Sequence, residues 1–296
     1  MIIPYYVVEP VLDESGMQTS VEITSPIGLP TPAEIRSRWT YGLSLADAQG
    51  RSMDDQDILG FLMTAVKETE RRLGILLKPT IIACNPDDRG LIQGLDYELE
   101  EQPYDYDIQK WSNYGFIQLR QRYAIEVSMF RLVSYAGQMT VDFMRYPEWI
   151  KLNKKHSQLQ IVNRGGNGLT AGTGYGMAYG STPFSTGLLS RTPQVFHVDY
   201  VAGLTPAQLT QDIKTIVAKQ ATVDVLGVAG DSTLAGMAGY SLSLDGISES
   251  FQSTASAMYG TYSAHITQLQ SEIAEFFDPR KGGARTKMRG FTMGGI

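Results

Sequence analysis

Residues 54–73 read DDQDILGFLMTAVKETERRL, and this stretch decides the first element of the fold. Three aspartates stand at its start and two arginines near its end, which suits the partial charges at the two ends of a helix. Apolar residues recur at spacings of three, four and seven, as on one face of a helix. They are Ile58, Leu62, Ala65, Val66 and Leu73. Gly74 is placed to end the helix, so the sequence predicts an amphipathic helix over Asp54–Leu73.

Three further segments predict helices. Thr31 as N-cap and Pro32 at the first helical position predict a short helix over Pro32–Trp39. Thr205-Pro206 opens a second long helix that runs to about Val228. A broad apolar stripe predicts a last helix over roughly Thr254–Phe277, and Asp278-Pro279 stops it.

The middle of the chain favours strands. Short β-branched or alternating runs follow one another there: Phe116–Leu119, Ile125–Tyr135, Thr140–Met144 and Gln158–Val162. Leu76–Cys84 resembles the start of a strand, and Val195–Tyr200 alternates like one. We therefore expect a small antiparallel β domain inserted between helices.

Together these patterns predict an α+β fold with a helical core of about three long helices, a small antiparallel β insert, and long extended loops and arms. The expected organisation is an extended N-terminal arm (1–31), a helical core (32–79 and 200–277), a β-rich insert (80–163), a glycine-rich loop (164–194) and a basic C-terminal arm (278–296). Such a plan is typical of an assembly part rather than an enzyme.

The glycine-rich loop cannot pack a core of its own. Gly165–Arg191 holds eight glycines, with Tyr175, Tyr179 and Phe184 spaced among them. A segment this rich in glycine cannot offset its ordering entropy alone. We expect its own fold or a neighbouring subunit to order it, and these three aromatic residues are the candidates for inter-subunit contacts.

Composition narrows the class of protein. The 296 residues carry a net charge of −6, so the whole chain offers no long-range attraction for nucleic acid. Charged residues make up only 19%, which suits permanent contacts. Cys84 is the only cysteine, so no intrachain disulfide can form, and no stretch is apolar enough to span a membrane. The N-terminus lacks the basic region of a signal peptide, so we expect synthesis in the cytoplasm.

The C-terminal tail is the one basic run. Its cations are Arg280, Lys281, Arg285, Lys287 and Arg289. The tail is either a solvated terminus, a docking arm for an acidic partner surface, or a segment that faces DNA. Because aromatic residues do not alternate with these cations, any DNA contact would be independent of sequence.

We find no catalytic or metal-binding pattern. His156, His197 and His265 are not spaced for a shared metal, and the HExxH, P-loop and GxSxG patterns are absent. The aspartates at residues 54, 55 and 57 fit a helix N-terminus better than an EF-hand. We expect no cofactor, no metal and no enzymatic activity.

Two alternatives from other classes stay open. One is a carbohydrate-binding or adhesin-like module that stacks sugars on Tyr104, Tyr106, Trp111 and Trp149. The other is a glycoside hydrolase that draws a carboxylate pair from the acidic segment. Its members are Asp96, Glu98, Glu100, Glu101, Asp105 and Asp107.

The run Met53–Leu76 resembles the first core helix of head–tail connector proteins of tailed bacteriophages, also called adaptor or head-completion proteins. Other segments are similar to later parts of those proteins: Lys78–Ala83, Arg145–Ile150, Leu159–Val162, Pro206–Val228 and Ser241–Ser256. The glycine-rich loop and the proline-rich N-terminal arm depart from the compact members of the family.

The resemblance implies a structural virion protein in the neck, at the head–tail interface. Such subunits form a ring, commonly of twelve, under the portal protein, where they extend the DNA channel and attach a neck, tail-terminator or stopper protein. It implies portal docking or non-specific contact with packaged DNA for the tail Arg280–Ile296. It implies contacts with neighbouring subunits or the next ring for Gly165–Arg191.

Overall fold

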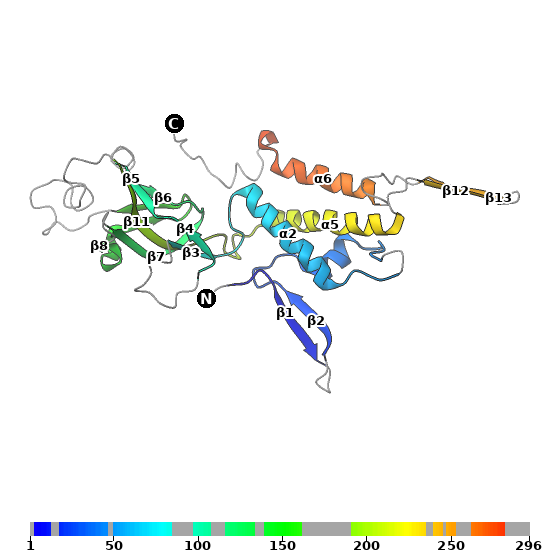
Figure 1. Ribbon diagram of the computed structural model, residues 1–296, viewed down its shortest axis with the longest axis horizontal. Helices are drawn as coiled ribbons and strands as arrows, with labels where there is room; N and C mark the ends of the chain where they lie inside the picture. Colours follow the sequence, from blue (N-terminus) through cyan, green and yellow to red (C-terminus); the bar gives the residue numbers. More distant parts are fainter. Residues whose placement is uncertain are drawn as a thin grey trace, which may run out of the picture. The chain divides into compact units, whose positions relative to one another are not determined.

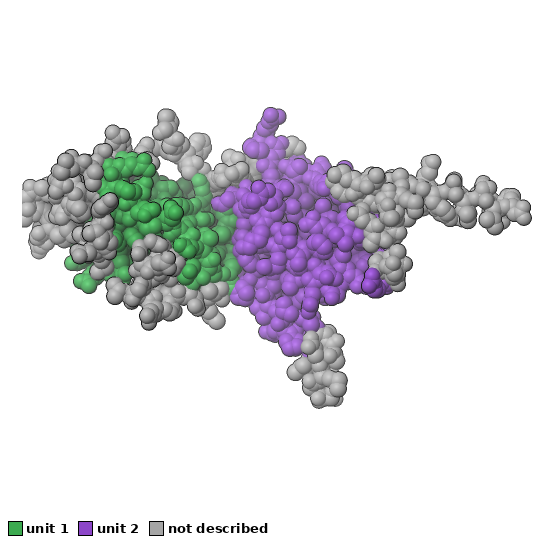
Figure 2. Space-filling view, in the orientation of Figure 1, with its two compact units in different colours: residues 1–3, 75–205 green, residues 4–74, 206–296 purple. Residues whose placement is uncertain are grey.

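The computed structural model describes residues 3–12, 18–46, 50–84, 97–107, 116–133, 139–161, 191–234, 239–244, 247–252 and 262–281. The chain divides into two compact units (Figure 2). Unit 1 consists of Met1–Ile3 and Ile75–Thr205, and unit 2 of Pro4–Gly74 and Pro206–Ile296.

Unit 2 is built around three helices (Figure 1): α2 (Asp55–Leu73), α5 (Gln211–Leu234) and α6 (Ser263–Phe277). Helix α5 packs against both α2 and α6. Because α5 contacts a helix on two sides, apolar residues occupy most of its circumference. Its fully buried apolar side chains include Ile213, Val217, Ala221, Val225 and Leu226.

The predicted ends of α2 are confirmed. The Asp54 carboxylate accepts a bond from the Asp57 backbone N–H at 2.7 Å, and the Asp57 carboxylate accepts one from the Asp54 N–H at 3.3 Å. Gly74 closes the helix in the left-handed conformation, with φ of 67°. Asp54 and Asp57 therefore cap the helix, because its N-terminal N–H groups need acceptors, while the Asp55 carboxylate pairs with Arg36.

A shorter helical segment precedes α2. Helix α1 (Pro32–Glu34) continues into the π-helical turn η1 (Ile35–Trp39). Thr31 and Glu34 form a capping box, which confirms the predicted start of this helix.

Two hairpins belong to unit 2. The first joins β1 (Val7–Leu12) to β2 (Gln18–Thr24), and the second joins β12 (Gly239–Leu244) to β13 (Ile247–Gln252). Each is a two-stranded antiparallel sheet, and within the described ranges neither pairs with a third strand.

Unit 1 contains the larger sheet. Its strands run in the order β4 (Leu99–Glu101), β3 (Thr80–Cys84), β11 (Arg191–Ala202), β7 (Ala124–Val133) and β8 (Met139–Asp142), and β5 (Tyr104–Asp107) also pairs with β11. Strand β11, of 12 residues, is central because it pairs with β3, β5 and β7. Only β3 and β4 are parallel among the described strands.

A smaller sheet completes unit 1 in the order β6 (Phe116–Gln118), β10 (Gln158–Ile161) and β9 (Ile150–Asn153). The 3-10 turns η3 (Phe143–Arg145) and η4 (Pro147–Trp149) lead from β8 to β9. The core of the unit is aromatic at its centre, where Phe130 stacks on Phe143 with ring centroids 4.5 Å apart.

The predicted fold class, a helical core of about three long helices with a small β insert, is wrong. The described residues hold thirteen strands in four sheets, and four α-helices of 3, 19, 24 and 15 residues. The sequence patterns did not indicate strands β12 and β13 between the last two helices, and they left β11 out of the insert. Strand β11 pairs with β3, β5 and β7, which lie far away in sequence, and a local pattern does not contain such partners.

Helix boundaries also differ. Helix α5 begins at Gln211 rather than Pro206 and continues to Leu234 rather than Val228. Helix α6 begins at Ser263, and residues 254–261, predicted as its first turns, lie outside the described residues. The glycine-rich loop, Gly165 to Ser190, also lies outside them.

Candidate functional site

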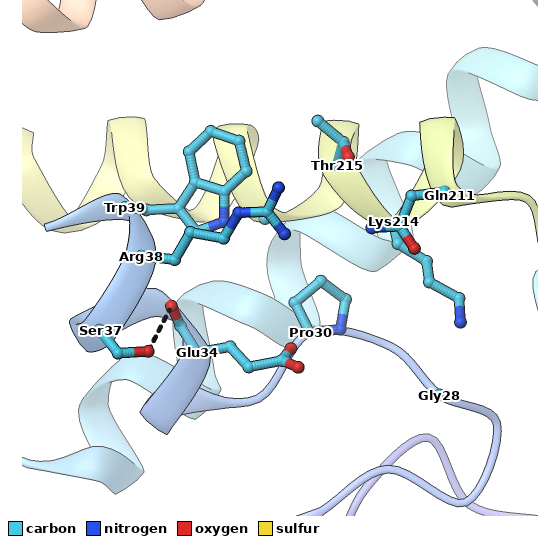
Figure 3. Close-up of a pocket in the computed structure, with 10 residues that line it drawn as sticks. Gly28, Pro30, Glu34, Ser37, Arg38, Trp39, Gln211, Lys214 and Thr215 are labelled. Atoms are coloured by element: carbon cyan, nitrogen blue, oxygen red, sulfur yellow. Dashed lines mark hydrogen bonds between the residues drawn. The ribbon is translucent and has the colours of Figure 1, made fainter.

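A polar hollow in unit 2 is a candidate site among the described residues. It lies where α1 and η1 meet the first turns of α5 (Figure 3), and its volume is about 210 Å³. We call it the Trp39 pocket, and its lining residues are Gly28, Pro30, Glu34, Ser37, Arg38, Trp39, Gln211, Lys214, Thr215 and Ala218.

Local backbone geometry places the cations of the Trp39 pocket. The capping box at Thr31 starts the helical segment, and the following π-helical turn carries Arg38 and Trp39 toward α5 (Figure 3). Gly28 has φ of 77°, and a Cβ there would lie 3.1 Å from the Lys214 Nζ. The missing side chain at Gly28 therefore leaves room for the Lys214 ammonium group.

Of the cationic side chains around the Trp39 pocket, only one is paired with a carboxylate among the described residues. The Arg38 guanidinium carbon lies 5.6 Å from the centre of the Trp39 ring, and Lys219 Nζ lies 6.0 Å from it. Lys219 is bound to Glu272 at 2.5 Å, and this bond lowers the pKa of the Glu272 carboxyl. Arg38 and Lys214 have no carboxylate partner within the described part of the chain.

One carboxylate shares the pocket with these cations. Glu34 accepts a bond from the Thr31 backbone N–H at 3.2 Å, so its carboxylate is held in the capping box. The lining thus has two cations and one carboxylate, beside an indole ring that is half-buried. Chemically, this arrangement suits an anionic group with some apolar surface, because guanidinium, ammonium and indole each offer it a contact.

A second hollow lies in unit 1, beside β5 and β6, and its own polar groups are paired. The Arg120 guanidinium lies over the Tyr104 ring at 4.3 Å and donates to the Pro103 carbonyl at 3.2 Å. The Gln194 backbone N–H and the Arg191 guanidinium hold the pKa of the Asp105 carboxyl below its usual range. The pairs inside this hollow stabilise the unit and leave little for a ligand.

Two members of the acidic segment, Glu98 and Glu101, are engaged in internal pairs. Glu101 is buried, and its carboxylate accepts bonds from the Tyr104 hydroxyl at 3.0 Å, the Tyr200 hydroxyl at 2.9 Å and the Gln121 amide at 2.9 Å. Glu98 is paired with the buried Lys78. These two carboxylates are therefore not available as a catalytic pair, and Asp96 lies outside the described residues.

The aromatic residues of the carbohydrate-binding alternative are core residues. Tyr104, Tyr106 and Trp149 are 7%, 2% and 6% exposed, so their faces cannot stack on a sugar. Trp111 lies outside the described residues.

The predicted tail and loop contacts fall mostly outside the described residues. Arg280 and Lys281 lie in the 3-10 turn η6 (Pro279–Lys281), where the Arg280 N–H donates to the Asp278 carboxylate at 2.9 Å. The others, Arg285, Lys287, Arg289, Tyr175, Tyr179 and Phe184, are not among the described residues. The structure therefore brings no predicted contact residues together within the ranges it describes.

Sequence reasoning missed the Trp39 pocket. The run Arg36-Ser-Arg38-Trp39 does place cations beside an indole, but Lys214 is more than 170 residues away in sequence. Only the packing of α5 near η1 brings these side chains to one hollow.

The described residues hold no group of three or more histidine, cysteine or acidic side chains that could bind a metal ion. Within those same ranges, no helix combines the length and the apolar character needed to cross a membrane.

No protein-family model and no curated protein sequence matches this chain. Two similar solved chains come from gene transfer agent particles. One belongs to the virion of the native particle, with 15% identity and a TM-score of 0.36, and covers 67% of this chain and 79% of that one. The other belongs to the neck of the empty particle, computed with C6 symmetry, with 14% identity and a TM-score of 0.34, and covers 73% and 82%. Likenesses this weak establish neither a shared fold nor a shared function.

Proposed function

We propose that this chain is a structural, non-catalytic virion protein that forms a ring in the neck of a tailed, phage-like particle. In this role it would dock under the portal, extend the DNA channel and offer an attachment surface to the next neck or tail protein. The proposal builds on the resemblance of Met53–Leu76 to head–tail connector proteins, and that run contains the well-capped helix α2.

The observation that carries the proposal is the pair of hairpins in unit 2. β1–β2 and β12–β13 pair only with themselves within the described ranges. A single two-stranded hairpin is marginally stable in water, so each gains from a surface that it can dock on. Repeated contacts between identical subunits provide such surfaces, and symmetry multiplies their modest strength.

The arrangement of charged groups adds support. Several acidic residues that the sequence offered for catalysis are engaged in internal pairs with Lys78, Arg191 and the tyrosines of the unit 1 sheet. Such pairs favour a rigid building block, because an active-site carboxylate must be free to contact a substrate.

Imaging tests this function directly. The purified protein would be examined by negative-stain electron microscopy alone and after mixing with portal rings of the same particle. The proposal expects closed rings, alone or stacked on the portal, with twelve subunits as the resemblance implies. Monomers that leave the portal undecorated would contradict it.

A further inference from the structure

Two glutamates face each other on the β1–β2 hairpin, and no cation among the described residues pairs with them. Glu9 on β1 is directly opposite Glu22 on β2 in the antiparallel register. Both are exposed, and neither has an ion-pair partner in the part of the chain that the structure describes. Like charges directly opposite on a two-stranded sheet destabilise it, because their Cβ atoms are only about 4.5–5.5 Å apart. The pair therefore favours a cationic partner.

The Trp39 pocket has the opposite character. Arg38 and Lys214 line it, and both lack a carboxylate partner among the described residues. Lys219, the other cation near the Trp39 ring, is already bound to Glu272. Within one copy, no ion pair joins Glu9 or Glu22 to Arg38 or Lys214 across the described ranges.

We propose that the β1–β2 hairpin of one copy docks in the Trp39 pocket of a second copy, with Glu9 and Glu22 against Arg38 and Lys214. The inference rests on the proposed function and names the contact between neighbouring subunits. It joins two different surfaces, so the contact is heterologous, and a heterologous contact generates a ring when its rotation closes.

Side-chain alternation supplies an apolar part of the same contact. Val11 is two residues from Glu9, so both side chains lie on one face of β1. Val11 is 38% exposed. When Glu9 and Glu22 meet the two cations, Val11 on the same face contacts the Trp39 ring, which lies beside those cations. Ion pairs then fix the register, and the apolar contact excludes water.

The test is a charge exchange between the two surfaces. E9K/E22K reverses the charge of the hairpin, and R38E/K214E reverses the charge of the pocket. Each variant alone places like charges at every contact. We therefore expect the dissociation constant of self-association, measured by sedimentation velocity with and without portal rings, to rise at least about tenfold. Mixing the two variants restores opposite charges where the reversed hairpin of one meets the reversed pocket of the other, so association should return.

Matched controls carry the same changes in net charge elsewhere. E126K/E148K and K154E/K155E alter exposed side chains of unit 1 and should assemble like the wild type. Circular dichroism checks that every variant is folded, which is expected because all the altered side chains of the two surfaces are exposed or half-buried.

A disulfide test is independent of charge. Cys84 is buried, and burial raises the pKa of its thiol to about 12, so it will not compete in mild oxidation. In a variant with E22C and K214C, oxidation should yield a ladder of covalent multimers that reducing agent removes. Neither single variant can extend such a ladder beyond a dimer.

The outcomes separate the two proposals. Restored association in the mixture, together with the covalent ladder, supports the hairpin contact. Wild-type rings with unimpaired single-surface variants and no ladder would overturn the contact and leave the ring function standing. A wild type that stays monomeric, even beside portal rings, would overturn both.

Discussion

At the scale of single residues, unit 1 depends on a buried polar network rather than on apolar packing alone. The Tyr200 hydroxyl donates to Glu101 at 2.9 Å and accepts the Gln121 backbone N–H at 3.1 Å. Tyr200→Phe removes both bonds and leaves a buried carboxylate with one donor fewer. We expect a loss of about 1–3 kcal/mol in the free energy of unfolding, measured in urea.

Tyr146→Phe is the matched control for that change. Tyr146 is 40% exposed and stacks on Trp149, so the same atom is removed from a ring whose hydroxyl water can reach. Its effect should stay within about 0.5 kcal/mol. Equal effects of the two substitutions would contradict the role given to the buried network.

Because of the same network, we expect the free energy of unfolding to fall at alkaline pH. Burial, and then the charge of Glu101, raises the pKa of Tyr104 to about 12 from its ordinary value of 10.0, and burial raises the pKa of Tyr200 as well. Between about pH 10 and about pH 12, the Tyr104 hydroxyl has lost its proton in the unfolded chain and keeps it in the folded protein. The free energy of unfolding is therefore full below about pH 10 and falls as the pH rises toward about 12. Urea unfolding at about pH 9 and about pH 11.5 should show this fall, and Tyr104→Phe should reduce it. A pH-independent wild type would contradict it.

At the scale of elements, two glycine positions of helix α2 differ in whether they tolerate a side chain. Gly74 closes the helix at φ of 67°, where a side chain is strained, whereas Gly60 lies inside the helix with open space where a Cβ would stand. Gly74→Ala should lower the free energy of unfolding by about 1 kcal/mol, because it forces alanine into the left-handed region. Gly60→Ala should raise it by about 0.5–1 kcal/mol. Thermal unfolding checks both, and the same sign for the two would contradict the assignment.

The elements also show what sequence patterns contain. Helix α2 was predictable because Asp54, Gly74 and the apolar face all lie within one segment. The sheet of unit 1 was not, because β11 finds partners in β3, β5 and β7, which the local alternation of Val195–Tyr200 cannot identify. The Trp39 pocket escaped for the same reason, since its two cations come from segments that only packing brings together.

At the scale of the whole molecule, helix α6 ends before the basic tail begins. Helix α6 ends at Phe277, whose ring contacts Phe276 and the Arg72 guanidinium, and Pro279 follows directly after Asp278. Removing residues 280–296 should therefore leave the thermal unfolding midpoint nearly unchanged while portal docking is lost. Pull-down with portal rings measures the docking. Normal head–tail joining by the truncated protein would contradict this role of the tail.

The central claim is that the chain works as a closed ring, and its mass in solution tests this most directly. Light scattering on the purified wild type, alone and with portal rings, would compare the species present with the 32.6 kDa of one chain. The account predicts a single closed assembly at an integral multiple of that mass, twelvefold for the ring that the connector resemblance implies. A species that remains at 32.6 kDa at every concentration, and beside portal rings, would contradict it.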